Sequence, residues 1–488
     1  MPSLKTEMEM GYLLDSNISE PDRLVIDNGR YCPARWTVAD IKSKVLKNVL
    51  TLQCVGELGM KLDTVKMSLT LGHTSDRADN DLPPLSKSAS HRQWLMDQAL
   101  SLFAFFQPEA LNPAGGFHAL AQDGTPLFCD REGGAVQHLH NTTRMIYSFA
   151  LARDLGVAGV DKIIDHGMDF LWSRHRDTKC GGYFWGVDNC GAPEPVKKAY
   201  GHAFVLLAAS AAKRASHPDA ERLLTDITEV IQTKFWEPAV GATTEDYSPD
   251  WCALDAYRGQ NSNMHLTEAL MAAFQATGVA MYLEMAESIA QLIIREHAQA
   301  ADWRVPEHFD AHWQVDYEYA GDPMFRPAGT TPGHALEWSR LLVELYILGQ
   351  RRHSWMVPAA EALFVNACTL GWNDTQGGFY YTLDWDNRPL QTACLWWPCA
   401  EAIGAAHVLQ SVSDNPIFEI WYRRVWTFVT NHLIDHSESG WFPEVDTALR
   451  PVDNIFVGKP DIYHAIQACL IPLKHEPTLG FSKKNIET

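Results

Sequence analysis

The chain has 488 residues, and 60 acidic residues against 40 basic ones give it a formal net charge of −20 at pH 7. This acidic excess argues against nucleic acid or an anionic membrane surface as a partner and favours a neutral small molecule. The N-terminus lacks a basic region followed by an apolar stretch, and ten cysteines show no CxxC spacing. The sequence therefore predicts a cytoplasmic protein with reduced thiols, no membrane span and no zinc site.

The first 88 residues differ from the rest of the chain in their balanced charge. A run rich in Ser, Asp and Pro from Thr74 to Ser90 is typical of a linker. One amphipathic helix is expected over Val38 to Val49. We therefore expect residues 1–88 to be an N-terminal extension of unknown role, partly linker, and residues 89–488 to form the main domain.

Short segments rich in glycine and aromatic residues recur at intervals of roughly 60 to 75 residues, with an amphipathic stretch on each side. They are GGFHALAQDG from Gly115, GGYFWGVD from Gly181, GATTEDYSPDW from Gly241, RVPEHFDAHWQVD from Arg304, GGFYYTLDWD from Gly377 and GWFPEVD from Gly440. This period is typical of helical hairpins that bury their apolar faces only against their neighbours. The pattern predicts an all-α fold in which six hairpins close into a double ring, with short β-hairpins or loops at one rim.

Four helices carry clear boundary signals. Asn141 is expected to precede a helix ending at Gly156, Asn261 or Asn263 one ending at Gly278, Thr331 and Pro332 one ending at Gly349, and Pro460 one ending before Pro472. Asn or Thr at the cap, Pro in the first turn and Gly past the end are the usual boundary residues of helices.

Polar residues gather near the beginnings of these four helices: Arg144, His265, His334 with Glu337, and His464. If the inner helices of the ring all begin at one rim, these side chains converge on one mouth. Helix N-termini add partial positive charge there, which stabilises an anionic intermediate and disfavours protonation of an imidazole. The sequence therefore predicts a site of neutral histidines facing a developing negative charge.

Four segments in order resemble the signature segments of the N-acylglucosamine 2-epimerase superfamily. They are YRGQNSNMHLTEA from Tyr257, TPGHALEWSRL from Thr331, WWPCAEAIGAAHVL from Trp396 and GKPDIYHAIQACLIP from Gly458. The similarity runs from about Ser90 to the C-terminus, and VKKAYGHAFVLLAAS from Val196 with the terminal DIYH is most similar to the bacterial mannose isomerase and sulfoquinovose isomerase branch. The resemblance implies an (α/α)6 barrel, in agreement with the hairpin count.

The resemblance also implies a cofactor-free and metal-free proton transfer between C1 and C2 of an open-chain monosaccharide, through a cis-enediol or enediolate. By motif, the two catalytic histidines are His334 and His464, and Arg144 contacts the reacting oxygens. Glu337 lies three residues after His334, so we expect it to orient that ring and raise its basicity. Neutral imidazoles can open the sugar ring and move the proton near neutral pH.

Further residues match family positions that bind the sugar, where aromatic faces stack on apolar sugar faces. The expected substrate-binding residues are His265, Asn261, Tyr200, Trp397, Glu401 and Arg326. The sulfoquinovose branch has an arginine where this chain has Met324, which argues against a sulfonated substrate. The resemblance therefore favours isomerisation of mannose to fructose, with lyxose and xylulose as a possible smaller pair.

Other activities stay open at this point. The same machinery gives a sugar 2-epimerase if the proton returns to the other face of C2, and sulfoquinovose isomerase remains an alternative. A glycoside hydrolase would need two carboxylates across a cleft, for which the loops offer Asp246, Asp250, Glu307 and Asp384. The segment PEHFDAH could hold a metal through His308, Asp310 and His312, although it lacks the paired carboxylates of metal-dependent sugar isomerases. A non-catalytic sugar-binding protein is a further alternative, and the oligomeric state is left open.

Overall fold

The computed structural model describes residues 42–46, 49–53, 65–68 and 84–474. The chain separates into two compact units, Met1–Pro83 and Pro84–Thr488. In the first unit, β1 (Lys42–Leu46), β2 (Val49–Gln53) and β3 (Val65–Ser68) form an antiparallel sheet in that order. The helix expected over Val38–Val49 is therefore wrong where the chain is described. A short apolar run fits both the helical spacing and the alternation of a strand, so the sequence alone does not separate the two. Residues 74–83 of the expected linker lie outside the described residues.

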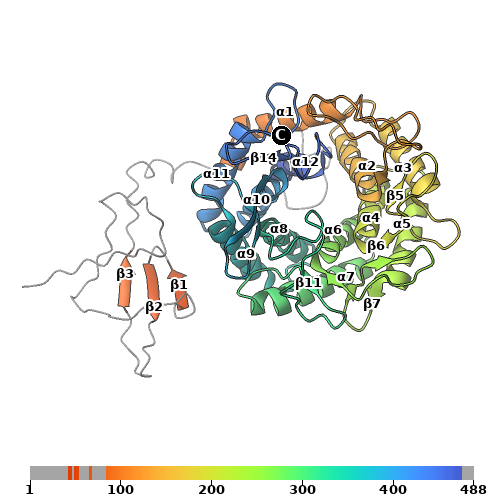
Figure 1. Ribbon diagram of the computed structural model, residues 1–488. Coiled ribbons are helices and arrows are strands. Elements are labelled where there is room, and N and C mark those ends of the chain that lie inside the picture. Colours follow the sequence, from red (N-terminus) through yellow and green to blue (C-terminus); the bar gives the residue numbers. More distant parts are fainter. Residues whose placement is uncertain (1–41, 47–48, 54–64, 69–83, 475–488) are drawn as a thin grey trace, which may run out of the picture. The chain divides into compact units, whose positions relative to one another are not determined.

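The described residues of the second unit, 84–474, include twelve α-helices. They are α1 (Ala89–Phe106), α2 (Leu139–Asp154), α3 (Asp161–Phe170), α4 (Ala199–Arg214), α5 (Ala220–Val230), α6 (Gln260–Thr277), α7 (Ala280–Ala290), α8 (Pro332–Leu348), α9 (Met356–Gly371), α10 (Trp396–Leu409), α11 (Ile417–His432) and α12 (Tyr463–Leu470). Even-numbered helices form an inner ring that closes where α12 contacts α2, and odd-numbered helices form the outer ring (Figure 1). The all-α (α/α)6 barrel is thereby confirmed.

The two rings differ in how their helices are buried. On α4 and α10 almost every residue is buried, and both helices are rich in alanine, so neighbours can pack against them on all sides. The outer helix α5 buries one stripe, which includes Leu223, Leu224 and Ile227, and exposes the other face. Each buried leucine or isoleucine contributes about 1.5–3 kcal/mol. Such a stripe has no partner outside the ring, which is why the hairpins are stable only together.

Short antiparallel strands lie at the starts of inner helices. They are β4 (Gln137–His138) with β5 (Gly186–Val187), β6 (Lys197–Lys198) with β9 (Asp246–Tyr247), β7 (Trp236–Glu237) with β8 (Ala242–Thr243), β10 (Arg258–Gly259) with β11 (His308–Phe309), and β12 (Tyr380–Leu383) with β13 (Pro389–Leu395) and β14 (Glu444–Val445). Strands β4, β6, β10 and β13 each end at the residue before an inner helix begins. The N-termini of these inner helices therefore share a strand-lined rim, as expected.

The glycine and aromatic segments are turns that return the chain from an outer helix to this rim. Asp177 and Asn373 each accept backbone N–H groups two and three residues later through Oδ1. Four residues after each of them, Gly181 and Gly377 adopt φ values of 77° and 87°, a region that favours glycine. The repeated sequence pattern therefore encodes a repeated turn.

Three of the four expected helix starts are wrong by two to four residues. Helices α2, α6 and α12 begin at Leu139, Gln260 and Tyr463, whereas the start at Thr331 and Pro332 is confirmed. A rim strand leads directly into α2 and α6, so no capping side chain is needed there. Asn263 instead accepts the backbone N–H of Thr243 and ties strand β8 to α6.

Among the described residues, no helix has the length and apolar character needed to cross a membrane.

Candidate active site

Two of the expected catalytic residues flank one tryptophan at the rim of the inner ring. The ring of Trp397, on α10, lies 5.2 Å from that of His334, on α8, and 5.8 Å from that of His464, on α12, between centroids. All three residues are only 5–7% exposed. The structure therefore brings together two histidines that are 130 positions apart in the sequence, through the closure of the ring.

Each of these histidines has a carboxylate at Nδ1. His334 Nδ1 lies 2.9 Å from Glu307, and His464 Nδ1 lies 2.9 Å from Glu401. Burial opposes ionisation of Glu401, but Arg340 and His464 lower its pKa to about 2. Burial likewise opposes ionisation of Glu307, and His334 nevertheless holds its pKa below the ordinary value. Ionised carboxylates only accept, so each Nδ1 donates a proton to its carboxylate, and in a neutral ring Nε2 then keeps a lone pair. The amide of Gln260, 2.9 Å from the same nitrogen of His334, donates to Glu307.

Two sequence expectations about these carboxylates need correction. Glu337 does not orient His334, because Glu307, from the segment before α8, occupies that position and also accepts the backbone N–H of Thr331. Glu401 does not line the pocket, because it is 1% exposed and lies behind His464. A spacing of three residues places two side chains on one helix face, but only the tertiary fold decides which carboxylate reaches the imidazole of His334.

Arg144, on α2, lies against Asp461 and Tyr463, in the segment that carries His464. Its guanidinium donates to Asp461 Oδ2 at 2.8 Å and to the Tyr200 hydroxyl at 3.0 Å. The same group lies over the rings of Phe204 and Tyr463, 4.5 and 4.7 Å from their centroids. A guanidinium held by an ion pair and two aromatic faces is a fixed positive charge that needs no reorganisation when negative charge develops nearby.

His265, on α6, lies beside this arginine. It is 4% exposed, and its ring packs edge-on against Tyr200 with centroids 5.2 Å apart. Burial lowers its pKa well below the ordinary histidine value, and the charge of Arg144 lowers it further. Burial also lowers the pKa of His464, against the opposing effect of Glu401. These two rings are therefore neutral near pH 7, and the cause is burial rather than the helix N-termini on which the sequence expectation rested.

Known proteins support a family assignment. The family model described as N-acylglucosamine 2-epimerase (GlcNAc 2-epimerase) matches residues 115–468. The chain belongs to the N-acylglucosamine 2-epimerase family. It is 41% identical over 391 residues to a D-mannose isomerase of Thermobifida fusca, covering 79% of this chain and 95% of that protein. It is 39% identical over 396 residues to a D-mannose isomerase of Pseudomonas cannabina pv. alisalensis, covering 79% and 94%. A crystal structure of D-mannose isomerase superposes with a TM-score of 0.74 at 32% identity, covering 80% and 99%.

In this family member, the segment between β11 and α8 carries the remaining expected contacts. Asn261 donates to the carbonyl oxygen of Phe325 at 3.4 Å, and the phenyl ring of Phe325 lies 5.8 Å from Tyr200. Arg326, expected to bind sugar, instead donates to Asp246 at 2.8 Å and lies 3.6 Å from Glu245. Its charge is therefore used to anchor the segment that positions Phe325.

Several site residues escaped sequence reasoning. They are Asp461, Phe325 and the stacked pair His140 and Trp185, whose ring centroids lie 4.9 Å apart with a 13° interplanar angle. The sequence suggests Glu307 only as a hydrolase carboxylate and not as the partner of His334. Glu307 and Asp461 both lie in segments that the sequence marks, PEHFD and KPDIYH. Nothing local shows their partners, because each partner comes from a different repeat.

The expected metal alternative does not fit the geometry of His308. Its Nδ1 pairs with the Tyr257 hydroxyl and its Nε2 with the carbonyl of Pro327, so both ring nitrogens are engaged. Asp310 binds backbone N–H groups of its own turn. The residues offered for a hydrolase are likewise occupied, because Glu307 pairs with His334 and Asp246 with Arg326.

A second group of possible metal ligands is deeper in the barrel. Donor atoms of His265, Glu268 and Glu337 lie within 4.8 Å of one another. The guanidinium of Arg340 already lies 3.6 Å from both Glu268 and Glu337. A divalent cation would have to share this space with a fixed positive charge, so the donor set suits an arginine better than a metal.

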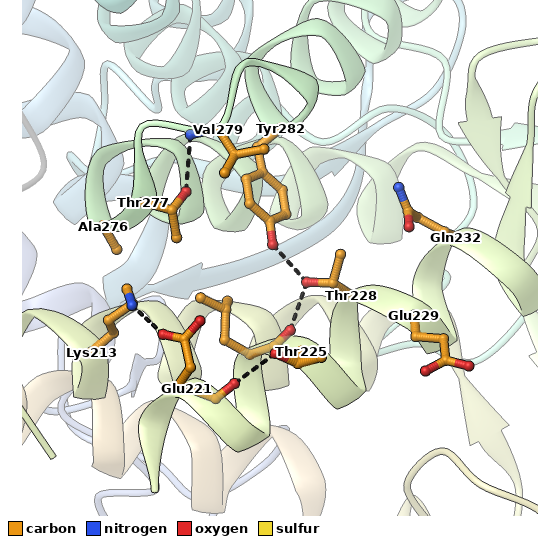
Figure 2. Close-up of a pocket in the computed structure, with 11 residues that line it drawn as sticks. Lys213, Glu221, Thr225, Thr228, Glu229, Gln232, Ala276, Thr277, Val279 and Tyr282 are labelled. Atoms are coloured by element: carbon orange, nitrogen blue, oxygen red, sulfur yellow. Dashed lines mark hydrogen bonds and ion pairs between the residues drawn. The ribbon is translucent and has the colours of Figure 1, made fainter. Parts of the chain in front are cut away.

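A groove of about 660 Å³ lies away from the site of His334 and His464, between α5 and the junction of α6 and α7 (Figure 2). Thr228 and Tyr282 hydrogen-bond across it at 2.7 Å, and Lys213 pairs with Glu221 at one edge. Two pairs of its polar groups therefore bind one another, and none of the residues expected at the active site lines it.

Proposed function

We propose that this protein is a cofactor-independent aldose–ketose isomerase that interconverts mannose and fructose by proton transfer between C1 and C2. The observation that carries the proposal is the pair His334 and His464, each fixed at Nδ1 by an ionised carboxylate, on either side of Trp397. The relatives named D-mannose isomerase, at 39% and 41% identity over most of the chain, support the choice of substrate.

The geometry supports a division of labour between the two sides of the site. One of His334 and His464 takes the proton from C2 through its free Nε2 and returns it to C1, and the other assists opening of the sugar ring. Removal of the proton leaves negative charge on the oxygens of a cis-enediolate. Arg144 offsets that charge, and Trp397 offers an aromatic face for the apolar side of the sugar.

The experiment that tests this function is proton NMR with mannose in D2O containing EDTA. Fructose carrying solvent deuterium is the expected product, since the proton passes through a group that exchanges with water. Glucose as the first product would make the protein a 2-epimerase. If mannose were unchanged, the same assay with lyxose, sulfoquinovose and cellobiose would identify or exclude those alternative substrates.

Phe325 is expected to limit the size of the substrate. Its ring packs against Tyr200, Trp185 and His140, each with a centroid 5.6–5.8 Å away. Replacing it with alanine removes this wall, so we expect KM for mannose to rise by about tenfold, or 1.4 kcal/mol of lost contact, with kcat little changed. Steady-state kinetics check this. Unchanged KM would show that Phe325 does not contact the sugar, and Tyr317→Ala, at an exposed position on the same segment, is the matched control.

The pH dependence should follow the neutral histidines. A base must be unprotonated, so activity is retained above its folded-state pKa and lost as pH falls through that value. Because burial lowers the pKa of His464, we expect the acid limb of kcat/KM below the ordinary histidine value of about 6.5. Glu401→Gln removes an interaction that raises this pKa and should move the limb lower still, together with a reduced rate. An acid limb above pH 7 contradicts this assignment.

A cytoplasmic location is part of the same proposal. The described cysteines, which include exposed Cys129, Cys190 and Cys252, are free thiols. Free exposed thiols suit a reducing compartment. The only partner that the site requires is a monosaccharide.

A further inference from the structure

Beneath His265 lies a buried cluster of charged side chains, with Arg340 at its centre. The guanidinium lies 2.9 Å from Glu401, 3.3 Å from Glu344, and 3.6 Å from both Glu268 and Glu337. Every side chain in this cluster is 0–2% exposed. One guanidinium cannot neutralise four carboxylates, even though Lys474 also favours the anions of Glu344 and Glu268, and an unpaired buried charge costs several kcal/mol. Some of these carboxyl groups must therefore carry protons.

The hydrogen bonds show which carboxyl group is least compensated as an anion. Glu401 accepts from Arg340 and His464, Glu344 accepts from Arg340, and Glu268 accepts from the Tyr463 hydroxyl. Neither oxygen of Glu337 has a hydrogen-bond partner in the described part of the chain. Burial and the nearby charge of Glu401 raise the pKa of Glu337 well above its usual range. Glu337 is thus the member of the cluster best suited to remain a neutral acid.

Glu337 is surrounded on every side by groups that bear on its protonation. They are Arg144 on α2, Tyr200 on α4, His265 and Glu268 on α6, Arg340 on α8, Glu401 on α10 and Tyr463 on α12. The two arginines favour the anion, whereas Glu268 and Glu401 oppose it. Arg144 is already paired with Asp461, and Arg340 is shared among four carboxyl groups. The balance of charge therefore favours the protonated form.

The nearest acceptor for that proton is His265. Its Nδ1 lies 3.5 Å from Glu337 Oε1, and this nitrogen is buried without a hydrogen-bond partner among the described residues. A neutral imidazole has one nitrogen that donates and one that accepts. A protonated carboxyl group has one hydrogen to give, so the two groups are complementary when both are neutral.

We propose that Glu337 is a neutral carboxylic acid that donates to Nδ1 of His265 and thereby keeps the proton of His265 on Nε2. This inference rests on the proposed isomerase function for its consequence, which is that His265 Nε2–H donates to a sugar oxygen that becomes negative in the enediolate. Glu307 and Glu401, as anions, fix the opposite tautomer on His334 and His464. The protonation states of three carboxyl groups thus divide three histidines into two bases and one donor.

The direct test is a long-range ¹H–¹⁵N spectrum of the full-length protein labelled at histidine. The His265 signal is identified by its loss in His265→Asn. We expect a protonated Nε2 and an accepting Nδ1 for His265, and the opposite pattern for His464 in the same spectrum. A proton on Nδ1 of His265, or on both nitrogens, would overturn the inference. Glu344→Gln, which alters the cluster at a carboxyl group paired with Arg340, should leave the His265 pattern unchanged.

Kinetics of two variants add a readout that a purely structural role would not move. Glu337→Leu removes the donor, and we expect kcat to fall by about 10- to 100-fold with little change in KM. Glu337→Gln should recover most of this loss, because its amide N–H can donate to Nδ1 as the acid does. Equal losses in two variants with matching melting temperatures would overturn the inference. The spectrum does not require turnover, so failure of the isomerase function and failure of this inference are distinguishable.

Discussion

Replacing His464 with asparagine should lower kcat for mannose by about 1,000-fold, within the range for loss of a general acid–base group. The expected loss follows from the position of His464, which is held by Glu401 at Nδ1 and lies beside Trp397, with no described residue hydrogen-bonded to its other nitrogen. Asparagine can still hydrogen-bond Glu401, so the buried carboxylate keeps a partner. Because no other group replaces the proton transfer, kcat should fall far more than sugar binding does.

Two measurements separate this result from a loss of folding. Binding of mannose by calorimetry should be retained within a few-fold, and deuterium should no longer enter the sugar in D2O. His407→Asn, near the C-terminal end of α10, is the matched control and should retain turnover. Turnover within tenfold of the unmodified protein would remove His464 from the proposed mechanism. The same measurements on His334→Asn would show which histidine transfers the proton. A variant that has lost only the residue that assists ring opening still moves deuterium into the sugar that is already open. A variant that has lost the base does not.

Replacing Arg144 with methionine should lower kcat and kcat/KM together by about 100- to 1,000-fold. The guanidinium is fixed by Asp461, Tyr200 and two aromatic rings, so its charge is in place before the enediolate forms. An interaction that strengthens only as charge develops reduces kcat when it is lost. The measurement is steady-state kinetics over a range of mannose concentrations.

The control for this variant concerns the carboxylate of Asp461, which loses its partner when Arg144 is replaced. Asp461 is 8% exposed and pairs with Arg144, so methionine alone leaves a buried carboxylate without its partner, at a cost of about 3–5 kcal/mol in stability. Adding Asp461→Asn should recover much of the thermal stability without recovering kcat. Recovery of both would mean that Arg144 serves the fold and not the reaction.

Local sequence patterns predicted the repeated helical hairpins because the residues that form each turn lie close together in the sequence. The turns after α3 and α9 each use a side-chain acceptor and a residue with positive φ, which Asp177 with Gly181 and Asn373 with Gly377 supply. Helix starts were less predictable. At α2 and α6 a rim strand pairs with a distant strand and leads directly into the helix, so the asparagines nearby are not caps.

The sequence by itself therefore determined the hairpin repeat, the closed double ring of helices and the histidines and arginine that face its centre. These features follow from helical periodicity, turn residues and motif order, all of which are written along the chain. Only the tertiary structure decided which carboxyl group meets which histidine. Glu307 reaches His334, Glu401 reaches His464 and Glu337 reaches His265. Each contact depends on how neighbouring repeats pack, and the shared burial around Arg340 then sets which of those carboxyl groups is charged.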